Sequence, residues 1–252
     1  MELNGKLALV TGGGRGIGLA VALRLARDGA KIIVTGRTRE DLDRTAEATH
    51  GHALTCDLSD RASTDAMIAS VKAIGRVDIL VNNAGIAESA PLAKTDDGMW
   101  DRIMELNATA PFRLTRAFVP AMIEQGWGRV ITIASNAGLN GYQYTSAYCA
   151  AKHAAVGMTR ALAIDLGRTG ITINAVCPGW VATRMADEAI ARIAARTGRT
   201  PAEARGALES MSPQRRLVEP EEVAAAVAML CTEGARGIHG QSIVIDGGQV
   251  LK

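Results

Sequence analysis

The residue types best suited to chemistry in this chain are Ser135, Tyr148 and Lys152, which lie in one short stretch. Ser135 ends an apolar run, and Tyr148 stands near the start of a predicted helix. A spacing of four residues places Tyr148 and Lys152 on one helix face, where the ammonium can act on the phenol. A neighbouring cation favours the phenolate, so it should lower the tyrosine pKa from its usual value near ~10. The pair could then exchange a proton with a substrate oxygen that Ser135 also binds.

The same spacing also fits an ordinary half-buried tyrosine beside a solvated lysine on an exposed helix. The surrounding elements must decide between the two interpretations.

Length and composition favour one large domain over residues 1–252. The 252 residues are 48% hydrophobic, which is enough for a sizeable core. The net charge of +2 does not indicate a nucleic acid or another strongly anionic partner. No apolar stretch approaches the ~18–20 residues of a membrane span, so we expect no membrane partner.

The four cysteines have neither CxxC nor metal-ligand spacing, and no signal peptide precedes the first predicted strand. They are Cys56, Cys149, Cys177 and Cys231. We expect a reduced, cytoplasmic protein with structural thiols and no bound metal.

A glycine-rich turn separates a predicted strand at 6–10 from a predicted helix at 19–28. Its sequence is Thr11-Gly12-Gly13-Gly14-Arg15-Gly16-Ile17-Gly18. Glycines let the backbone approach a pyrophosphate, and the N–H groups of a helix N-terminus favour its negative charge. A flexible loop would show the same composition, but the flanking strand and helix favour a dinucleotide site. Its predicted contacts are Gly12, Arg15, Gly16, Ile17 and Gly18.

The second predicted strand, 31–35, runs into Gly36 and Arg37. An acidic residue at this point would bond the ribose 2′-hydroxyl of NAD, whereas an arginine suits a 2′-phosphate. Arg15 could approach the same phosphate from the glycine turn, so the two arginines predict NADP. Each could also be a solvated surface cation.

Two further strand ends carry candidate cofactor contacts. Asp57 and Leu58 follow the predicted strand 53–56, where an adenine edge could lie, although Asp57 could also serve a cap or turn. Asn83, Ala84 and Gly85 follow the predicted strand 77–81, and the small residues would let the backbone lie against a ribose.

Asn107 falls inside a predicted helix at 99–110, with another helix at 112–125. Asparagine is a poor helix former because it competes for backbone hydrogen bonds. It could bend the helix around a water or point to solvent.

Seven predicted strands alternate with helices, which indicates an α/β fold with a Rossmann-type, doubly wound parallel sheet and helices on both faces. Residues 184–212 are helical in pattern but have no strand partners. We expect an amphipathic insertion that covers the site, with a fixed helical pair in the core as the alternative.

Taken together, the motifs resemble the short-chain dehydrogenases/reductases over essentially the whole chain. The motifs are Thr11-Gly12-x-x-x-Gly16-x-Gly18, Asn82-Asn83-Ala84-Gly85, Asn107, Ser135, Tyr148-x-x-x-Lys152 and Pro178-Gly179. The resemblance implies that Tyr148 donates or accepts the proton and that Ser135 holds the substrate oxygen. It implies that Lys152 lowers the tyrosine pKa and bonds the nicotinamide ribose, while Asn107 holds a water that links Lys152 to solvent.

The resemblance also implies cofactor contacts near the end of the sixth strand. Pro178, Gly179 and Val181 would lie near the nicotinamide, and Thr183 near its amide or the phosphates. It further implies a homotetramer, with helix pairs and the final strand near Asp246 at the interfaces.

The substrate class follows from a comparison within this family. Residues 147–153 and 177–181 resemble 3-hydroxybutyrate dehydrogenases and also bacterial 3-oxoacyl and polyketide ketoreductases. The hydroxybutyrate enzymes hold a carboxylate with polar and basic residues at positions matching Ala87, Ala137 and Thr145 here. A buried carboxylate without a partner is costly, so a small free hydroxy acid is not expected. The predicted substrate contacts are Ala137, Leu139, Tyr142, Tyr144, Trp180 and Met185.

The sequence therefore predicts an NADPH-dependent carbonyl reductase that transfers a hydride to a ketone and yields a secondary alcohol. The expected substrate is a 3-oxoacyl thioester, a polyketide-like ketone or a bulky apolar ketone. The alternative in the same class is an NAD-dependent secondary-alcohol or 3-hydroxyacyl dehydrogenase. A more remote alternative is a nucleotide-sensing interaction protein without catalysis.

Overall fold

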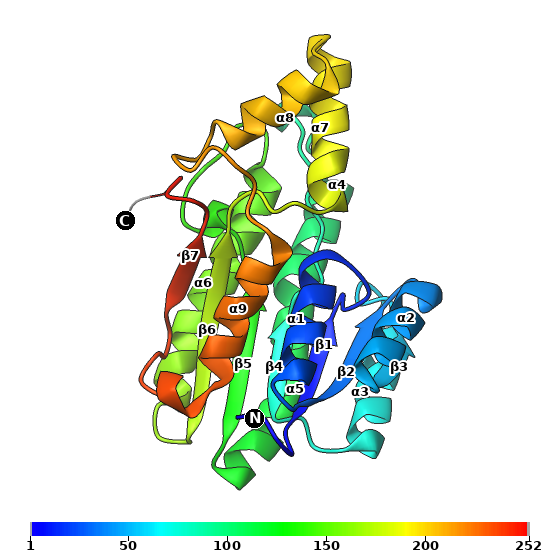
Figure 1. Ribbon diagram of the computed structural model, residues 1–252, viewed down its shortest axis with the longest axis vertical. Coiled ribbons are helices and arrows are strands. Elements are labelled where there is room, and N and C mark those ends of the chain that lie inside the picture. The colour runs from blue at the N-terminus through cyan, green and yellow to red at the C-terminus, as the bar shows by residue number, and fades with distance from the viewer. Residues whose placement is uncertain (1, 251–252) are drawn as a thin grey trace.

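Seven parallel strands form one sheet in the computed structural model, which describes residues 2–250 (Figure 1). The strands are β1 (Leu7–Thr11), β2 (Lys31–Gly36), β3 (His52–Thr55), β4 (Ile79–Asn82), β5 (Gly128–Ile133), β6 (Ile171–Pro178) and β7 (Ser242–Ile245). Their order across the sheet is β3-β2-β1-β4-β5-β6-β7, and every neighbouring pair is parallel. The predicted doubly wound sheet is therefore confirmed.

Helices cover both faces because strand side chains alternate between two hydrophobic clusters. In β1, Ala8 and Val10 pack in the cluster with α1 (Gly16–Arg27), α2 (Arg39–Thr49) and α9 (Pro220–Cys231). Leu7 and Leu9 point the other way, into the cluster formed by α3 (Arg61–Ile74), α5 (Ala110–Gln125) and α6 (Ser146–Leu166). The strands are apolar on both faces, as a sheet buried between two helical layers requires.

The strand order reverses between β1 and β4, and such a switch point leaves a crevice at the carboxyl ends of the strands. Thr11, the last residue of β1, joins the two strands there. Its hydroxyl accepts hydrogen bonds from the N–H groups of Asn83 (2.9 Å) and Ala84 (3.0 Å). The glycine turn and the residues after β4 are thus held as one unit.

The two helices predicted at 99–110 and 112–125 form a single helical run. It comprises α4 (Asp97–Met104), a π-helical turn (Glu105–Thr109) and α5. The two predicted helices are therefore joined, and Pro111 lies in the first turn of α5, which comes directly after the π-helical turn. Asn107 occupies the π-helical turn, the kind of irregularity that its poor helix propensity indicated.

Residues 184–212 form α7 (Arg184–Thr197) and α8 (Pro201–Glu209), which project beyond the carboxyl end of the sheet (Figure 1). They share a separate small cluster that includes Ala189, Ile190 and Leu208. The segment that enters α7 is fixed by Val218, whose carbonyl accepts from Ala182 N–H (2.8 Å) and whose N–H donates to Trp180 (2.8 Å).

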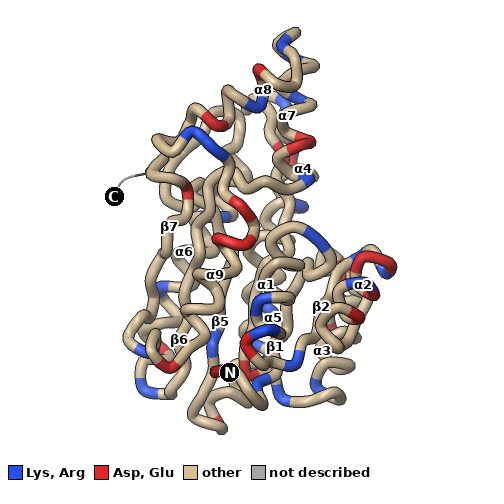
Figure 2. The backbone as a smooth tube through the Cα atoms, viewed as in Figure 1, with Lys and Arg blue, Asp and Glu red and all other residues tan. Residues whose placement is uncertain are grey.

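Acidic and basic residues are interspersed along the outer helices in the view of Figure 2, as the near-neutral net charge leads one to expect. All four cysteines are free thiols. Among residues 2–250, no helix is both long and apolar enough to cross a membrane.

Gly18 sits where only glycine fits, which gives a first testable prediction. A Cβ at this position would lie 2.2 Å from the Gly12 carbonyl oxygen and 2.6 Å from Asn83 Nδ2. We expect Gly18→Ala to lower the free energy of unfolding by ~1–3 kcal/mol, because backbone must move to relieve the overlap. Thermal and denaturant unfolding will measure it.

The matched control is Gly206→Ala in α8, where a Cβ meets nothing within 4 Å. This change should raise the free energy of unfolding by ~0.5–1 kcal/mol. Equal effects of the two substitutions would contradict the close contact at Gly18.

Candidate active site

Ser135, Tyr148, Lys152 and Asn107 come from three elements that meet at the carboxyl edge of the sheet. Ser135 follows β5, Tyr148 and Lys152 lie in the first two turns of α6, and Asn107 lies in the π-helical turn. The tyrosine and lysine are half-buried and buried respectively, so the alternative of a solvated lysine on an exposed helix is wrong.

Lys152 is only 5% exposed, and its ammonium donates to the Ile133 carbonyl at 2.9 Å. Burial lowers the pKa of Lys152 to about 8, since removing an ammonium from water disfavours its charged form. Attraction to the nearby Cys177 thiol acts in the opposite direction. The bond to β5 fixes the ammonium beneath the tyrosine, with Nζ 5.7 Å from the ring centroid.

The Tyr148 ring packs on the cluster formed by Met99, Ile103, Ala147 and Ala151. Burial raises the pKa of Tyr148 to about 12, and a hydrogen bond with the Ser135 side chain partly offsets this. The expected lowering of this pKa by Lys152 is therefore not observed in the protein alone. Desolvation is the largest cause of the raised pKa of Tyr148, and burial lowers the pKa of Lys152 at the same time.

Asn107 is 1% exposed and bonds the helix backbone with its amide nitrogen. Nδ2 donates to the carbonyls of Ile103 (2.9 Å) and Ile86 (3.0 Å). Its buried Oδ1 has no hydrogen-bond partner among residues 2–250 and faces Gly85, where a Cβ would lie 2.5 Å from Oδ1 and 3.7 Å from Lys152 Nζ. An unpaired buried acceptor beside an ammonium suits a bridging water.

The glycine turn has the geometry of a phosphate cradle. Gly12 and Gly16 adopt left-handed conformations with φ of 64° and 53°, which favour glycine. No side chain caps α1, whose first N–H groups are therefore available to an anion. A cradle of this kind fits the pyrophosphate of a dinucleotide.

Arg15 and Arg37 are both exposed at this edge, and neither forms an ion pair with another residue of 2–250. By contrast, Arg39 is bonded to Asp43 at 2.8 Å. Neither arginine is held in a salt bridge in the described part of the chain, although Arg37 lies close enough to Asp57 to help lower the pKa of that carboxyl.

Thr183 joins the end of β6 to the glycine turn. Its methyl carbon would lie 3.1 Å from a Cβ at Gly16, and its hydroxyl donates to the Val181 carbonyl at 3.3 Å. The Pro178–Gly179 turn precedes it, and Gly179 N–H donates to the Ile245 carbonyl at 3.0 Å. These predicted contacts lie together at the carboxyl edge.

Asp57 follows β3 at the same edge, and the next residue, Leu58, is buried. The pKa of Asp57 is lowered because Ser59 donates to its carboxylate through both hydroxyl (2.6 Å) and N–H (2.9 Å). Asp57 thus closes a turn, with part of its carboxylate engaged by protein. Asn83 likewise turns inward, donating to the carbonyls of Thr11 (2.8 Å) and Gly12 (3.2 Å).

Three of the predicted substrate contacts flank the Ser135 turn. Ala137 is buried in the short 3₁₀ helix Asn136–Gly138, and Leu139 packs on the cluster that includes Ala134 and Cys177. Tyr144 is 49% exposed with φ of 64°, unusual for a side chain of this size, and its carbonyl accepts from Ala90 N–H at 2.9 Å. Such strain is often found at binding sites.

The other three point to different surroundings. Tyr142 has a buried hydroxyl, and burial raises its pKa with a further contribution from Asp246 of the C-terminal tail. Trp180 packs on the α7–α8 cluster, and Met185 is 42% exposed on α7. The contact of all six residues with substrate stays a prediction.

The sequence did not reveal three contacts that hold the site together, although Thr11 and Asp246 were both noted in it. Ile133 offers a carbonyl to Lys152, Thr11 bridges two strands, and Asp246 binds the turn after Ser135. Only Thr11 carried a signal, as a polar residue at the end of an apolar strand. Within the described chain, no group of three metal-ligating side chains is clustered.

Comparison with known proteins places the chain beside oxidoreductases. A family model described as short chain dehydrogenase matches residues 6–193. The chain is 38% identical to D-beta-hydroxybutyrate dehydrogenase of Cupriavidus necator, over 99% of this chain and 100% of that protein. It is also 38% identical to a putative ketoacyl reductase of Streptomyces coelicolor, over 96% of each.

A solved structure supports the same relationship. A single-residue variant of actinorhodin polyketide ketoreductase, crystallised with NADPH, matches with a TM-score of 0.92 and 38% identity. The match covers 97% of each chain.

The lowered pKa of Lys152 predicts a pH-dependent stability. Between about pH 8 and pH 10.5 the unfolded chain holds a proton on this lysine that the folded protein has released, so folding becomes more favourable as pH rises. Below this window the folded protein carries the full cost of the buried charge. The free energy of unfolding of wild type should therefore rise relative to that of Lys152→Met. The gain should be up to ~3 kcal/mol between about pH 7 and about pH 10.

Chemical denaturation at several pH values will measure this difference. The exposed Lys72→Met in α3 is the control and should give a difference that does not change with pH. A constant difference for Lys152→Met would contradict the lowered pKa.

Proposed function

This chain belongs to the short-chain dehydrogenase family, and on that basis we propose that it is an NADPH-dependent carbonyl reductase that converts a ketone to a secondary alcohol. The observation that carries the proposal is the joint placement of Ser135, Tyr148 and Lys152. A hydrogen bond links the serine and tyrosine side chains, and the buried ammonium lies beneath the ring. A protein that only binds nucleotides has no need of this set.

When bound, the nicotinamide supplies the hydride that reduces the carbonyl carbon. Ser135 donates a hydrogen bond to the carbonyl oxygen and orients it. Tyr148, which the site keeps protonated, gives its proton to the oxygen as negative charge develops there. Lys152 and a water at Asn107 Oδ1 then return a proton to the phenolate from solvent.

The preference for NADPH rests on Arg15 and Arg37, which flank the position of the adenine ribose and form no ion pair within residues 2–250. Gly36 precedes Arg37, where an acidic residue would select NAD. A 2′-phosphate would gain charge-assisted hydrogen bonds from both arginines. NADPH in turn favours reduction as the working direction.

The proposed substrate is a 3-oxoacyl thioester, a polyketide-like ketone or a bulky apolar ketone. Thr145, at a position where hydroxybutyrate enzymes hold a carboxylate, uses its hydroxyl on the Tyr142 carbonyl at 2.9 Å. Arg102 on α4 is paired at 3.2 Å with Glu88, the residue that follows Ala87. A free carboxylate would therefore lack a dedicated partner.

Similarity to D-beta-hydroxybutyrate dehydrogenase favours a second candidate in the same class. This is an NAD-dependent dehydrogenase of a secondary or 3-hydroxyacyl alcohol, with Tyr148 as the base. The cofactor comparison below distinguishes the two.

Three further properties belong to the proposal. Helices α7 and α8 would cover bound substrate and exclude water, since they project at the carboxyl edge and share a cluster of their own. The protein would be a cytoplasmic homotetramer, consistent with free thiols and with apolar residues exposed on α5, such as Phe112 at 43%.

Tyr148→Phe tests the chemistry. Removing the hydroxyl should lower kcat by ~10²-fold or more, because Tyr148 is the proposed proton donor to the oxygen, while NADPH binding should change little. NADPH oxidation will be followed with a panel of cyclic and aryl ketones and 3-oxoacyl thioesters. Full turnover by Tyr148→Phe would contradict the assignment, and absence of wild-type turnover on the whole panel would favour the nucleotide-sensing alternative.

Arg37→Ala tests the cofactor. Losing a charge-assisted bond to the 2′-phosphate should raise KM for NADPH by ~10–100-fold and leave KM for NADH nearly unchanged. The matched control is Arg39→Ala, which removes an arginine already engaged by Asp43 and should alter neither KM. A wild-type preference for NADH would contradict the roles of Arg15 and Arg37.

A further inference from the structure

Asp246 is a buried carboxylate for which the proposed reaction has no evident use. It follows β7 directly, is 4% exposed, and has no ion-pair partner within residues 2–250. A buried carboxylate without hydrogen bonds is strongly destabilising, so its four donors identify what it holds.

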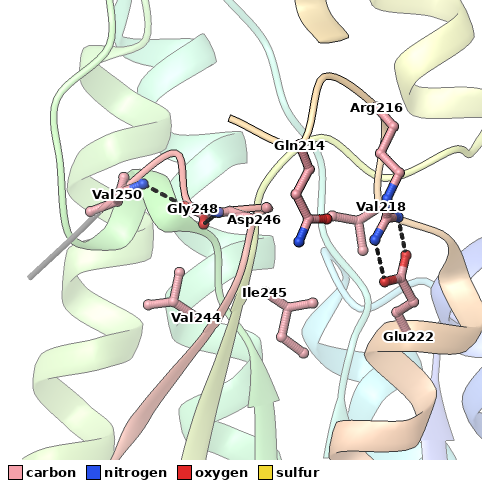
Figure 3. A pocket seen from close by; sticks show the side chains of 10 residues that line it. Gln214, Arg216, Val218, Glu222, Val244, Ile245, Asp246, Gly248 and Val250 are labelled. Carbon is pink, nitrogen blue, oxygen red and sulfur yellow. Dashed lines mark hydrogen bonds and ion pairs between the residues drawn. The ribbon is translucent and has the colours of Figure 1, made fainter. Parts of the chain in front are cut away.

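Three of these donors are backbone N–H groups of the tail that follows. Oδ1 accepts from the N–H groups of Gly248 and Gln249, both at 3.0 Å. Oδ2 accepts from the N–H group of Val250 at 2.9 Å (Figure 3). Gly247 and Gly248 have φ of 65° and 84°, which lets the tail curl around the carboxylate. The tail is thereby fixed at the edge of the sheet.

The fourth donor comes from the turn beside the catalytic serine. Asn136 Nδ2 lies 3.3 Å from Asp246 Oδ2 and 3.1 Å from Gln249 Oε1. Asn136 is 5% exposed and follows Ser135 directly. The tail therefore hydrogen-bonds to the residue next to the serine. The contact crosses the end of β6, which lies between β5 and β7. Gly179 follows β6 there and leaves room for Asp246, since a Cβ on Gly179 would lie 2.7 Å from Asp246 Cβ.

The hydrogen bond between Asn136 and Asp246 is linked to the Ser135 hydroxyl through the short 3₁₀ helix. The Asn136 carbonyl accepts from Leu139 and Asn140, both at 3.0 Å. Ser135 Oγ accepts from Ala137 N–H at 3.1 Å, and the Ser135 carbonyl accepts from Gly138 N–H at 2.9 Å. The Asn136 side chain is thus bound to the C-terminal tail, while its backbone belongs to the turn that carries Ser135.

The tail also contacts the segment that returns from α8. The Gly247 carbonyl accepts from Gln214 N–H at 3.3 Å, and a Cβ at Gly247 would lie 2.8 Å from Ser212 Oγ. A cavity of about 410 Å³ lies beside this contact, lined by Gln214, Val244 and the Arg216–Glu222 ion pair among others (Figure 3). The Asp246 tail is thus held by the segment after α8 and also lines this cavity.

We propose that Asp246 is a positioning residue for the Ser135 hydroxyl and acts through Asn136. This inference rests on the proposed function for its catalytic consequence. Asp246 and the tail fix the Asn136 side-chain amide by hydrogen bonds. This fixes the position of the 3₁₀ turn, and the turn orients Ser135 Oγ toward the substrate oxygen. Small displacements of such a group cost activity because the reacting geometry is narrow.

Asp78 supplies a matched control for a merely structural role. It is also a buried carboxylate, 5% exposed, and accepts from Leu7 N–H at 2.8 Å. It lies just before β4, at the opposite edge of the sheet from Ser135. Asp78→Asn should lower thermal stability without moving the serine.

Hydrogen exchange reads the turn directly, whatever the substrate. In Asn136→Ala and in Asp246→Asn, the amides of Ala137, Leu139 and Asn140 should exchange ~10-fold faster than in wild type. Asn136→Ala leaves the three tail amides on Asp246 and so keeps the tail folded. Unchanged exchange in both variants, or equal acceleration in Asp78→Asn, would overturn the proposal.

Kinetics test the catalytic consequence with the ketone of highest turnover. Each of the two variants should lower kcat ~10-fold while KM for NADPH changes less than ~3-fold. In a Ser135→Ala background the same substitutions should lower kcat less than ~2-fold, because the group they position is gone. Equal losses with and without Ser135 would overturn the proposal, whereas an inactive wild type would contradict the proposed function and leave the exchange result to decide.

Discussion

The hydrogen bond from the Lys152 ammonium to the Ile133 carbonyl is the contact on which the site depends. It ties the second turn of α6 to the end of β5, and so fixes Tyr148 relative to Ser135. Burying an ammonium against one backbone carbonyl is costly, and the lowered pKa of Lys152 expresses that cost. An exposed lysine would avoid this cost. It would also remove the polar link between α6, which carries Tyr148, and β5, which leads to Ser135.

A second set of hydrogen bonds that positions the site lies at the topological switch point, between β1 and β4. Thr11 and Asn83 exchange hydrogen bonds between the ends of β1 and β4, while Gly18 packs on the Gly12 carbonyl. The glycine turn is therefore rigid, with its N–H groups oriented before any ligand arrives. Preorganised donors of this kind lose little entropy on binding a phosphate, which is why a short turn can hold a dinucleotide.

Burial sets the protonation state of the tyrosine in the protein alone. The pKa of Tyr148 is raised to about 12 although a lysine lies beneath its ring. For a reductase this is useful, since the phenol must carry its proton when the ketone arrives.

The sequence by itself determined the strands, most helix positions, the parallel sheet and the four candidate catalytic residues. Periodicity and glycine placement report local structure, and the spacing of Tyr148 and Lys152 fixes a common helix face. Only the tertiary structure decided the continuous helical run through Asn107, the raised pKa of Tyr148 and the inward turn of Asn83. It alone revealed the contact between Asp246 and Asn136. These features depend on desolvation and on partners from distant segments, which no local pattern records.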